Sequence, residues 1–276
     1  MCGTFAYMGH QTISLTQVIK VLRILETEQE TGEPSPVGGH GAGIAFLNQK
    51  HEFALFKVGK TKGSPVHHLK RQLSNTATRS QVILGHVRRA SPEFQDTIQH
   101  AECTQPYQPH CRQNLNLISA HNGFLQNYQQ LKIQLNVTHR FESEPIRLID
   151  SEVIPHLYEE LLAQAKDTTK AVHTLHEQIE GNNTAIIITA HKQEAYLHAI
   201  HKGKTRGLTV WISPKGEVLL CSREQPVQRT LHELLTESNY QGIITIHRTD
   251  TVNIQAHFRL RLPPQPQTKP HPYNQP

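Results

Sequence analysis

The chain begins MCGTFAYMGH over residues 1–10, so a cysteine stands directly after the initiator methionine. One interpretation is that Cys2 is a small apolar residue at the head of a strand formed by TFAYM. The other is that Met1 is removed, which leaves Cys2 with a thiol and a free α-amino group. These groups have pKa values of about 8.5 and about 7.7–8.0, so the amine could take the thiol proton. The first residues alone favour the strand, and the rest of the chain favours the nucleophile.

Composition excludes several classes of protein. The chain has 276 residues and a net charge of +5, and its basic residues are scattered rather than clustered, so we expect no nucleic-acid partner. No apolar run approaches the roughly 20 residues that a membrane helix needs, and no secretion signal precedes the first strand. We therefore expect a cytoplasmic protein without a membrane partner, in which the four cysteines are thiols.

A few helices alternate with many short strands along the chain. Apolar spacing predicts helices at 14–30, 150–164 and 168–180. Short apolar runs predict strands at 43–46, 51–58, 81–86, 115–120, 185–190, 195–200, 208–212 and 218–222. This mixture favours a layered domain of helices and sheets over a helix bundle or a β-sandwich. The final residues, PPQPQTKPHPYNQP, are rich in Pro and Gln, and we expect them to be disordered.

Four polar clusters could carry chemistry, and three of them follow a strand or begin a helix. They are Cys2-Gly3, Gly85–Ser91, His121–Phe124 and Asp150–Glu152. Each also has a simpler interpretation. Asn122 and Gly123 form a common turn pair, Asp150 could be a helix N-cap, and Arg88 could be a surface arginine. Taken singly, the simpler interpretations are favoured.

Taken together, the clusters are similar to a known family. The segments MCGTFAY, GHVRRAS, AHNGFLQNYQQL and DSEVIPHLYEEL resemble, in order and spacing, the glutaminase domain of the class II glutamine amidotransferases. The likeness is greatest to the glutaminase half of the glutamine–fructose-6-phosphate aminotransferases, which act in amino-sugar biosynthesis. It covers residues 1–259, and we treat 260–276 as a separate tail. The resemblance implies an α+β fold, the four-layer αββα sandwich of two antiparallel sheets found in N-terminal-nucleophile hydrolases.

The resemblance also implies a catalytic set for hydrolysis of the glutamine side-chain amide. Cys2 matches the family nucleophile, which forms a thioester with the glutamyl group and releases ammonia. Asn122 and Gly123 match the residues whose side-chain amide and backbone N–H form the oxyanion hole. Such donors act on charge that develops in the transition state.

Three further residues match the groups that bind L-glutamine. Arg88 matches the arginine that holds the α-carboxylate, which a guanidinium can do with two parallel hydrogen bonds. Ser91 stands beside that carboxylate, where the family has a threonine. Asp150 matches the carboxylate that holds the α-ammonium group.

The sequence departs from the family pattern in three ways. Arg89 replaces an aromatic residue that shapes and closes the glutamine pocket, and Gln105 replaces a histidine. The synthase half of the family is also absent from this sequence. We therefore expect L-glutamine as substrate and a separately encoded synthase subunit that accepts the ammonia. The sequence leaves open whether the protein forms a homo-oligomer.

Other functions are weighed against this one. A stand-alone γ-glutamyl amide hydrolase and a glutamine-binding regulator without catalysis both remain alternatives. A zinc site could use side chains of the segment HAECTQPYQPHC, namely His100, Cys103, His110 and Cys111. The paired spacing of structural zinc sites is missing there, so we expect no metal ligands and no cofactor.

Overall fold

The computed structural model describes residues 2–29, 36–75, 79–112, 115–135, 139–240 and 242–264. The strands are β1 (Gly3–Ser14), β2 (Gly41–Leu47), β3 (Phe53–Gly59), β4 (Arg79–Arg88), β5 (Asn116–Gly123), β6 (Asn183–His191), β7 (Glu194–Gly203), β8 (Leu208–Ile212), β9 (Val218–Cys221), β10 (Gly242–Ile246) and β11 (Val252–Arg261). The α-helices are α1 (Leu15–Thr27), α2 (Pro65–Gln72), α3 (Tyr128–Gln134), α4 (Asp150–Ala165), α5 (Thr168–Gln178), α6 (Glu224–Thr230) and α7 (His232–Glu237).

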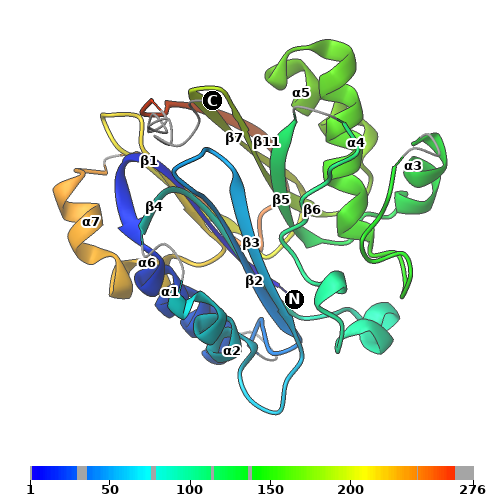
Figure 1. Ribbon diagram of the computed structural model, residues 1–276, viewed down its shortest axis with the longest axis horizontal. Coiled ribbons are helices and arrows are strands. Elements are labelled where there is room, and N and C mark those ends of the chain that lie inside the picture. Colours follow the sequence, from blue (N-terminus) through cyan, green and yellow to red (C-terminus); the bar gives the residue numbers. More distant parts are fainter. Residues whose placement is uncertain are drawn as a thin grey trace, which may run out of the picture.

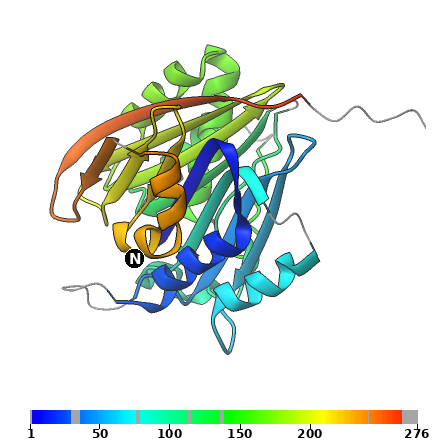
Figure 2. The ribbon, with the colours of Figure 1, turned by 90° about the vertical axis from the view of Figure 1, so that its left-hand side faces the viewer.

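The strands form two antiparallel sheets that face each other (Figure 1). One sheet has the order β10-β8-β9-β1-β4-β2-β3, and the other has the order β11-β7-β6-β5. Figures 1 and 2 show α1, α2, α6 and α7 on the outer side of the first sheet, while α4 and α5 cover the second. The predicted four-layer αββα sandwich of two antiparallel sheets is confirmed.

Strand alternation creates the layer between the sheets. Successive side chains of a strand point to opposite faces, so alternate residues of β1 and β4 share a face. The same buried cluster contains Ala6 of β1, Leu84 of β4 and Ala120 of β5. The opposite face of β1 packs Phe5 and Tyr7 against α1. This inter-sheet layer is apolar along most of its length and becomes polar where β1 begins.

Helix α1 forms much as its sequence predicts. Val18, Leu22 and Leu25 are fully buried against the first sheet, and the side chain of Ser14 caps the helix by accepting a hydrogen bond from the backbone N–H of Thr16. The short helix α2, by contrast, is not among the predicted elements.

The chain end and the cysteines bear on other expectations. Strand β11 continues to Arg261, and the backbone N–H of Leu262 donates to the carbonyl of Gln193, so the last strand passes the expected boundary at residue 259. Residues 265–276 of the predicted tail lie outside the described residues.

All four cysteines are free thiols. Within the described ranges, none of the helices is long and apolar enough to cross a membrane.

Candidate active site

A cavity of about 530 Å³ opens where β1 begins and β4 and β5 end. Its lining includes all six residues proposed from the sequence, namely Cys2, Arg88, Ser91, Asn122, Gly123 and Asp150. These residues come from four separate segments of the chain, and the fold brings all of them to one place.

The same alternation that builds the inter-sheet layer aims three of these side chains. Gly3 of β1 pairs with Val87 of β4, so Cys2 lies beside the end of β4. Arg88 is on the face of β4 that carries Leu84, and Asn122 is on the face of β5 that carries Ala120. Polar side chains therefore replace apolar ones on the inward faces at this end.

The thiol of Cys2 lies against the backbone of Arg89. The N–H of Arg89 donates to Sγ at 3.3 Å, and Sγ is 3.5 Å from the carbonyl oxygen of the same residue. This contact holds the sulfur at the end of β4. Cys2 is half-buried, so a substrate in the cavity can reach it. Met1 lies outside the described residues, and its removal stays a prediction.

Asn122 is fixed from one side of its amide group. Its Nδ2 donates to Oγ of Ser222 at 2.9 Å, and this hydroxyl accepts a hydrogen bond from the backbone N–H of Thr4 at 2.8 Å. Asn122 is 3% exposed. The amide group carries two N–H donors, so the second stays available to a ligand in the cavity.

Gly123 requires the absence of a side chain. Its φ of +139° is one that L-residues rarely adopt, and a Cβ there would lie 2.1 Å from the carbonyl oxygen of Asn182. Asn122 and Gly123 both belong to β5 and pair with Thr184 and Asn183, so their interpretation as a turn pair is wrong.

Arg88 is buried rather than a surface arginine, so that simpler interpretation is wrong. It is 4% exposed and donates to the carbonyl oxygen of Thr97 at 3.2 Å and to the Thr97 hydroxyl at 2.6 Å. No carboxylate in the described part of the chain forms an ion pair with Arg88. The guanidinium has five N–H donors, and those left over can bind an anion in the cavity.

Asp150 is a buried carboxylate at the first residue of α4. One oxygen accepts the backbone N–H of Leu125 at 2.9 Å, and the other accepts the Ser151 hydroxyl at 3.3 Å. Ile149 is the residue at the N-cap position, so the simpler interpretation of Asp150 as the cap is wrong. Burial raises the pKa of Asp150, and a bound cation would stabilise its charged form. Ser91 also presents a buried hydroxyl that has no hydrogen-bond partner among the described residues.

A second set of residues holds this end of β5. The side chain of Gln105 donates to the carbonyl of His121 at 3.0 Å and accepts from its backbone N–H at 2.6 Å. The His121 ring lies 2.9 Å from the hydroxyl of Ser151 and 2.9 Å from Oδ1 of Asn183. Burial lowers the pKa of His121. Gln105 thus holds the strand that carries Asn122 with two hydrogen bonds.

Sequence reasoning missed two residues that orient the site. Thr97 holds Arg88, and Ser222 holds Asn122. Nothing in the segment around Thr97 signals this contact. Ser222 lies directly after β9, and its role depends on the pairing of β9 with β1.

The cavity carries more cations than carboxylates. Its lining also includes Arg89, Lys204, Arg206 and Arg248, whereas Asp150 is its sole carboxylate among the described residues. Nη1 of Arg89 donates to the carbonyl oxygen of Gly38 at 3.4 Å. An anionic ligand group therefore fits this lining better than a cationic one.

Comparisons with known proteins agree with this arrangement. A family described as a glutamine amidotransferase domain matches residues 95–228. Glutamine–fructose-6-phosphate aminotransferase of Nostoc sp. (strain PCC 9229) is 28% identical over 200 residues, which are 69% of this chain and 27% of that protein. The enzyme of the same name from Thermus thermophilus is 30% identical over 200 residues, which are 67% of this chain and 29% of that protein. The chain thus spans less than a third of these relatives.

Solved structures show the same fold. A structure described as the allosteric regulatory enzyme of purine biosynthesis aligns with a TM-score of 0.62 at 18% identity, over 94% of this chain and 49% of the other. The glutamine phosphoribosylpyrophosphate amidotransferase of B. subtilis aligns with a TM-score of 0.59 at 18% identity, over 92% of this chain and 49% of the other. The chain carries a class II glutamine amidotransferase domain, similar to the glutaminase half of glutamine–fructose-6-phosphate aminotransferase.

Proposed function

We propose that this domain hydrolyses the side-chain amide of L-glutamine to glutamate and ammonia, with Cys2 as the nucleophile. The observation that carries the proposal is the convergence of a thiol, a buried arginine, a buried carboxylate and an anchored amide in one cavity. They belong to Cys2, Arg88, Asp150 and Asn122. Glutamine needs one such group for each of its end charges and two for its reacting amide.

The two end charges would orient the substrate. Arg88 would bind the α-carboxylate with the donors that Thr97 leaves free, and the Ser91 hydroxyl would add one hydrogen bond. Asp150 would bind the α-ammonium group, which offsets the cost of its buried charge. Holding both ends fixes the side-chain amide toward Cys2 and makes the attack effectively intramolecular.

The chemical steps then follow from the groups around Cys2. With Met1 removed, the α-amino group takes the thiol proton and the thiolate attacks Cδ of glutamine. The oxygen of the tetrahedral intermediate accepts from Nδ2 of Asn122 and the backbone N–H of Gly123. The C–N bond breaks and the proton leaves with ammonia. Water then hydrolyses the resulting Cys2 thioester to glutamate, which regenerates the thiol.

The ammonia acceptor is the second part of the proposal. The similar proteins are named aminotransferases, so we expect an acceptor for the released ammonia. We assign amide hydrolysis to the described domain and the use of ammonia to a separately encoded synthase subunit. Co-purification of such a subunit, with a rise in glutaminase activity on binding, would support this assignment.

A γ-glutamyl amide larger than glutamine is a second candidate substrate. The observation that favours it is the cationic lining of the cavity, to which Arg89 contributes. Comparing kcat/KM for glutamine and for γ-glutamyl dipeptides, with the wild type and Arg89→Phe, distinguishes the two. A preference for the dipeptides that Arg89→Phe abolishes would replace glutamine as the assigned substrate.

The direct test is to incubate the Met-processed protein with L-glutamine and measure glutamate and ammonia. Equal release of both products is expected from the wild type, and none above background from Cys2→Ala. The matched control is Cys103→Ala, because Cys103 is fully buried outside the cavity. Full activity in Cys2→Ala would refute the proposed nucleophile. Glutamine binding without turnover in the wild type would favour a regulator.

A further inference from the structure

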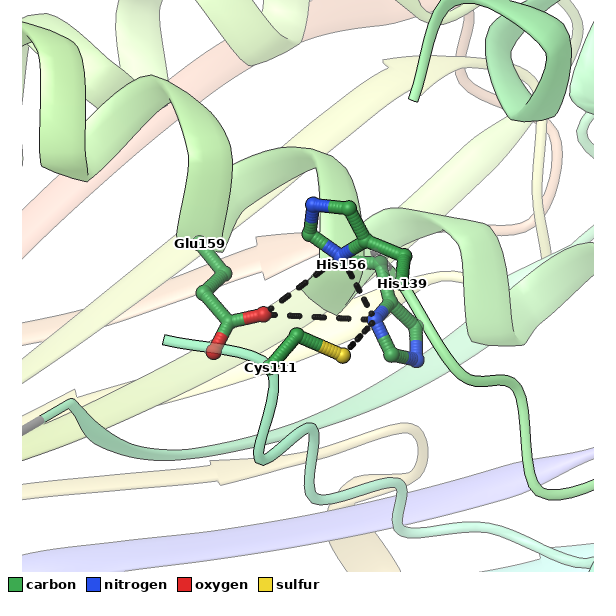
Figure 3. Close-up of side chains that lie close together, drawn as sticks. All are labelled: Cys111, His139, His156 and Glu159. Atoms are coloured by element: carbon green, nitrogen blue, oxygen red, sulfur yellow. Dashed lines mark hydrogen bonds and ion pairs between the residues drawn. The ribbon is translucent and has the colours of Figure 1, made fainter. Parts of the chain in front are cut away.

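Four potential metal ligands converge outside the cavity, on the side of α4 (Figure 3). His156 and Glu159 lie one turn apart on α4, and Cys111 and His139 come from the segments before β5 and after α3. One potential ligand atom from each lies within 4.8 Å of all the others. We call this group the Cys111 cluster. His139, His156 and Glu159 are buried, and Cys111 is half-buried.

Four of the six distances between ligand atoms of the Cys111 cluster are close to the edges of a tetrahedron, and all six are within 4.8 Å. Sγ of Cys111 is 3.5 Å from Nδ1 of His156, and the two histidine Nδ1 atoms are 3.2 Å apart. Oε2 of Glu159 is 3.6 Å from Nδ1 of His139 and 4.0 Å from Nδ1 of His156. Around zinc, with Zn–N bonds of about 2.0–2.1 Å and a Zn–S bond of about 2.3 Å, neighbouring ligand atoms lie about 3.3–3.6 Å apart.

Oε2 of Glu159 is the atom of the cluster that most favours binding of a cation. Oε2 of Glu159 is buried and makes no hydrogen bond among the described residues, and Glu159 is 0% exposed. An unsatisfied buried carboxylate oxygen is costly. A divalent cation between the four atoms would satisfy this oxygen. It would also remove the need for a shared proton between the facing Nδ1 atoms of His139 and His156.

A carboxylate lies near the second ring nitrogen of each histidine in the cluster. Nε2 of His139 is 3.4 Å from a carboxylate oxygen of Glu160. Nε2 of His156 is 3.9 Å from a carboxylate oxygen of Glu152. Metal-binding histidines characteristically have a carboxylate, carbonyl or water on the nitrogen that faces away from the metal. Both rings therefore direct Nδ1 to the centre of the cluster.

The other two ligands are held by backbone groups. The N–H of Arg112 donates to Oε1 of Glu159 at 2.7 Å, which leaves Oε2 facing the centre. The N–H of Arg140 donates to Sγ of Cys111 at 3.3 Å. This contact and the one to Glu159 hold both ligand atoms in position facing the histidines.

We propose that Cys111, His139, His156 and Glu159 bind one Zn²⁺ ion in a tetrahedral structural site. One thiolate, two imidazoles and one carboxylate are the donor types that zinc accepts. Four protein ligands and mostly buried surroundings leave no open position for a substrate. The ion would fasten the segments that carry Cys111 and His139 to α4, the helix that begins with Asp150.

This site differs from the one that the sequence suggested and set aside. Of the four residues weighed there, Cys111 alone belongs to the cluster. His100 and His110 are exposed, and Cys103 is buried in the core beside α4. The expectation of no metal ligands followed from spacing within one segment, whereas these ligands come from three segments.

The metal itself is the first readout. The full-length protein, purified from zinc-supplemented medium, should contain about one zinc ion per chain by elemental analysis. Cys111→Ser and Glu159→Gln should lose it. The matched control is His198→Ala, because His198 is also a buried histidine whose Nδ1 faces another histidine, His257, at 2.8 Å. This control should retain its zinc. Glu160→Gln should weaken zinc binding by about 10–100-fold, because it removes an outer hydrogen-bond partner.

Cobalt substitution reports the ligand set independently of zinc content and of catalysis. The Co²⁺-loaded protein should show the intense visible bands of tetrahedral cobalt and a thiolate-to-cobalt charge-transfer band, and Cys111→Ser should lose the latter. A strong chelator should lower the Tm of the wild type and of His198→Ala but leave that of Glu159→Gln unchanged. Wild type without bound zinc and without these bands would overturn the proposal, as would equal metal content in wild type, Cys111→Ser and Glu159→Gln.

Discussion

The cavity around Cys2 and the Cys111 cluster lie along the same helix, α4, yet they are built differently. Asp150 begins the helix and lines the cavity, while His156 and Glu159 belong to its following turns. In the cavity, Arg88 and Asn122 are each anchored on one side and keep donors for a ligand. In the cluster, the four ligand atoms face one another. One arrangement suits a substrate that enters and leaves, and the other suits an ion that stays.

This difference predicts which property each change affects. A change in the cavity should alter kinetic constants and leave the Tm nearly constant. A change in the Cys111 cluster should alter metal content and Tm while leaving the chemical step intact.

The largest expected effect concerns the oxyanion hole. Asn122→Ala should lower kcat for glutamine by about 10²–10³-fold, because it removes a donor to charge that develops in the transition state. KM and Tm should change little. Steady-state kinetics with a thermal melt measures all three. Ser222→Ala, which frees the Asn122 side chain, should cause a smaller loss. An unchanged kcat in Asn122→Ala would remove this residue from the mechanism.

Substrate binding gives the next largest effect. Arg88→Ala should raise KM about 10–100-fold, because hydrogen bonds to a charged group contribute about 1.5–3 kcal/mol. Thr97→Val should raise KM less, since it removes the hydroxyl that accepts from the Arg88 guanidinium. Initial rates across a range of glutamine concentrations give both values. If Arg88→Ala kept the wild-type KM, the α-carboxylate would be bound elsewhere.

Gly123 lines the cavity, yet its substitution should also lower the stability of the protein. It is therefore an expected exception to the contrast between the cavity and the Cys111 cluster. Gly123→Ala should lower the free energy of unfolding by about 1–3 kcal/mol, because a strained φ is added to a clash with the carbonyl of Asn182. Urea denaturation measures the change. Gly63→Ala is the control, since a Cβ there meets nothing within 4 Å. Equal stability of both variants would contradict the positive φ of Gly123 and the close approach of the Asn182 carbonyl at the end of β5.

The smallest effect is a pH dependence of stability near the cavity. His86 is 0% exposed, and burial, followed by the charge of Arg88, lowers its pKa to about 3. The unfolded chain takes up this proton near its ordinary pKa of about 6.5, while the folded chain does not. Stability should therefore fall as the pH drops from about 6.5 toward 4. In denaturation series across this range, His86→Gln should lose less stability than the wild type. Parallel curves would contradict a buried neutral His86.

The sequence predicts the cavity well for a physical reason. Cys2, Arg88, Asn122 and Asp150 stand at strand ends or at a helix start, within local patterns that can be recognised without the fold. Strand alternation then suffices to bring them together. The supporting residues, such as Thr97 and Ser222, could not be found this way, because their roles are contacts across distant segments.

The Cys111 cluster could not be predicted at all from spacing. His156 and Glu159 have helical spacing, but the same pattern also fits a buried helix face. Cys111 and His139 come from irregular segments whose positions follow from tertiary packing. The short helix α2 was missed for a related reason: it buries few apolar residues, among them Val66 and Leu69.

The central claim is that Cys2 is an N-terminal nucleophile in a cavity that binds glutamine. Covalent labelling tests this claim directly. The protein would be treated with a diazoketone analogue of glutamine, digested, and analysed by peptide mass spectrometry. We expect one adduct on a peptide that begins at Cys2 without Met1, with protection by excess L-glutamine. An adduct spread equally over Cys103, Cys111 and Cys221, or labelling of Cys2 with Met1 still attached, would contradict the account.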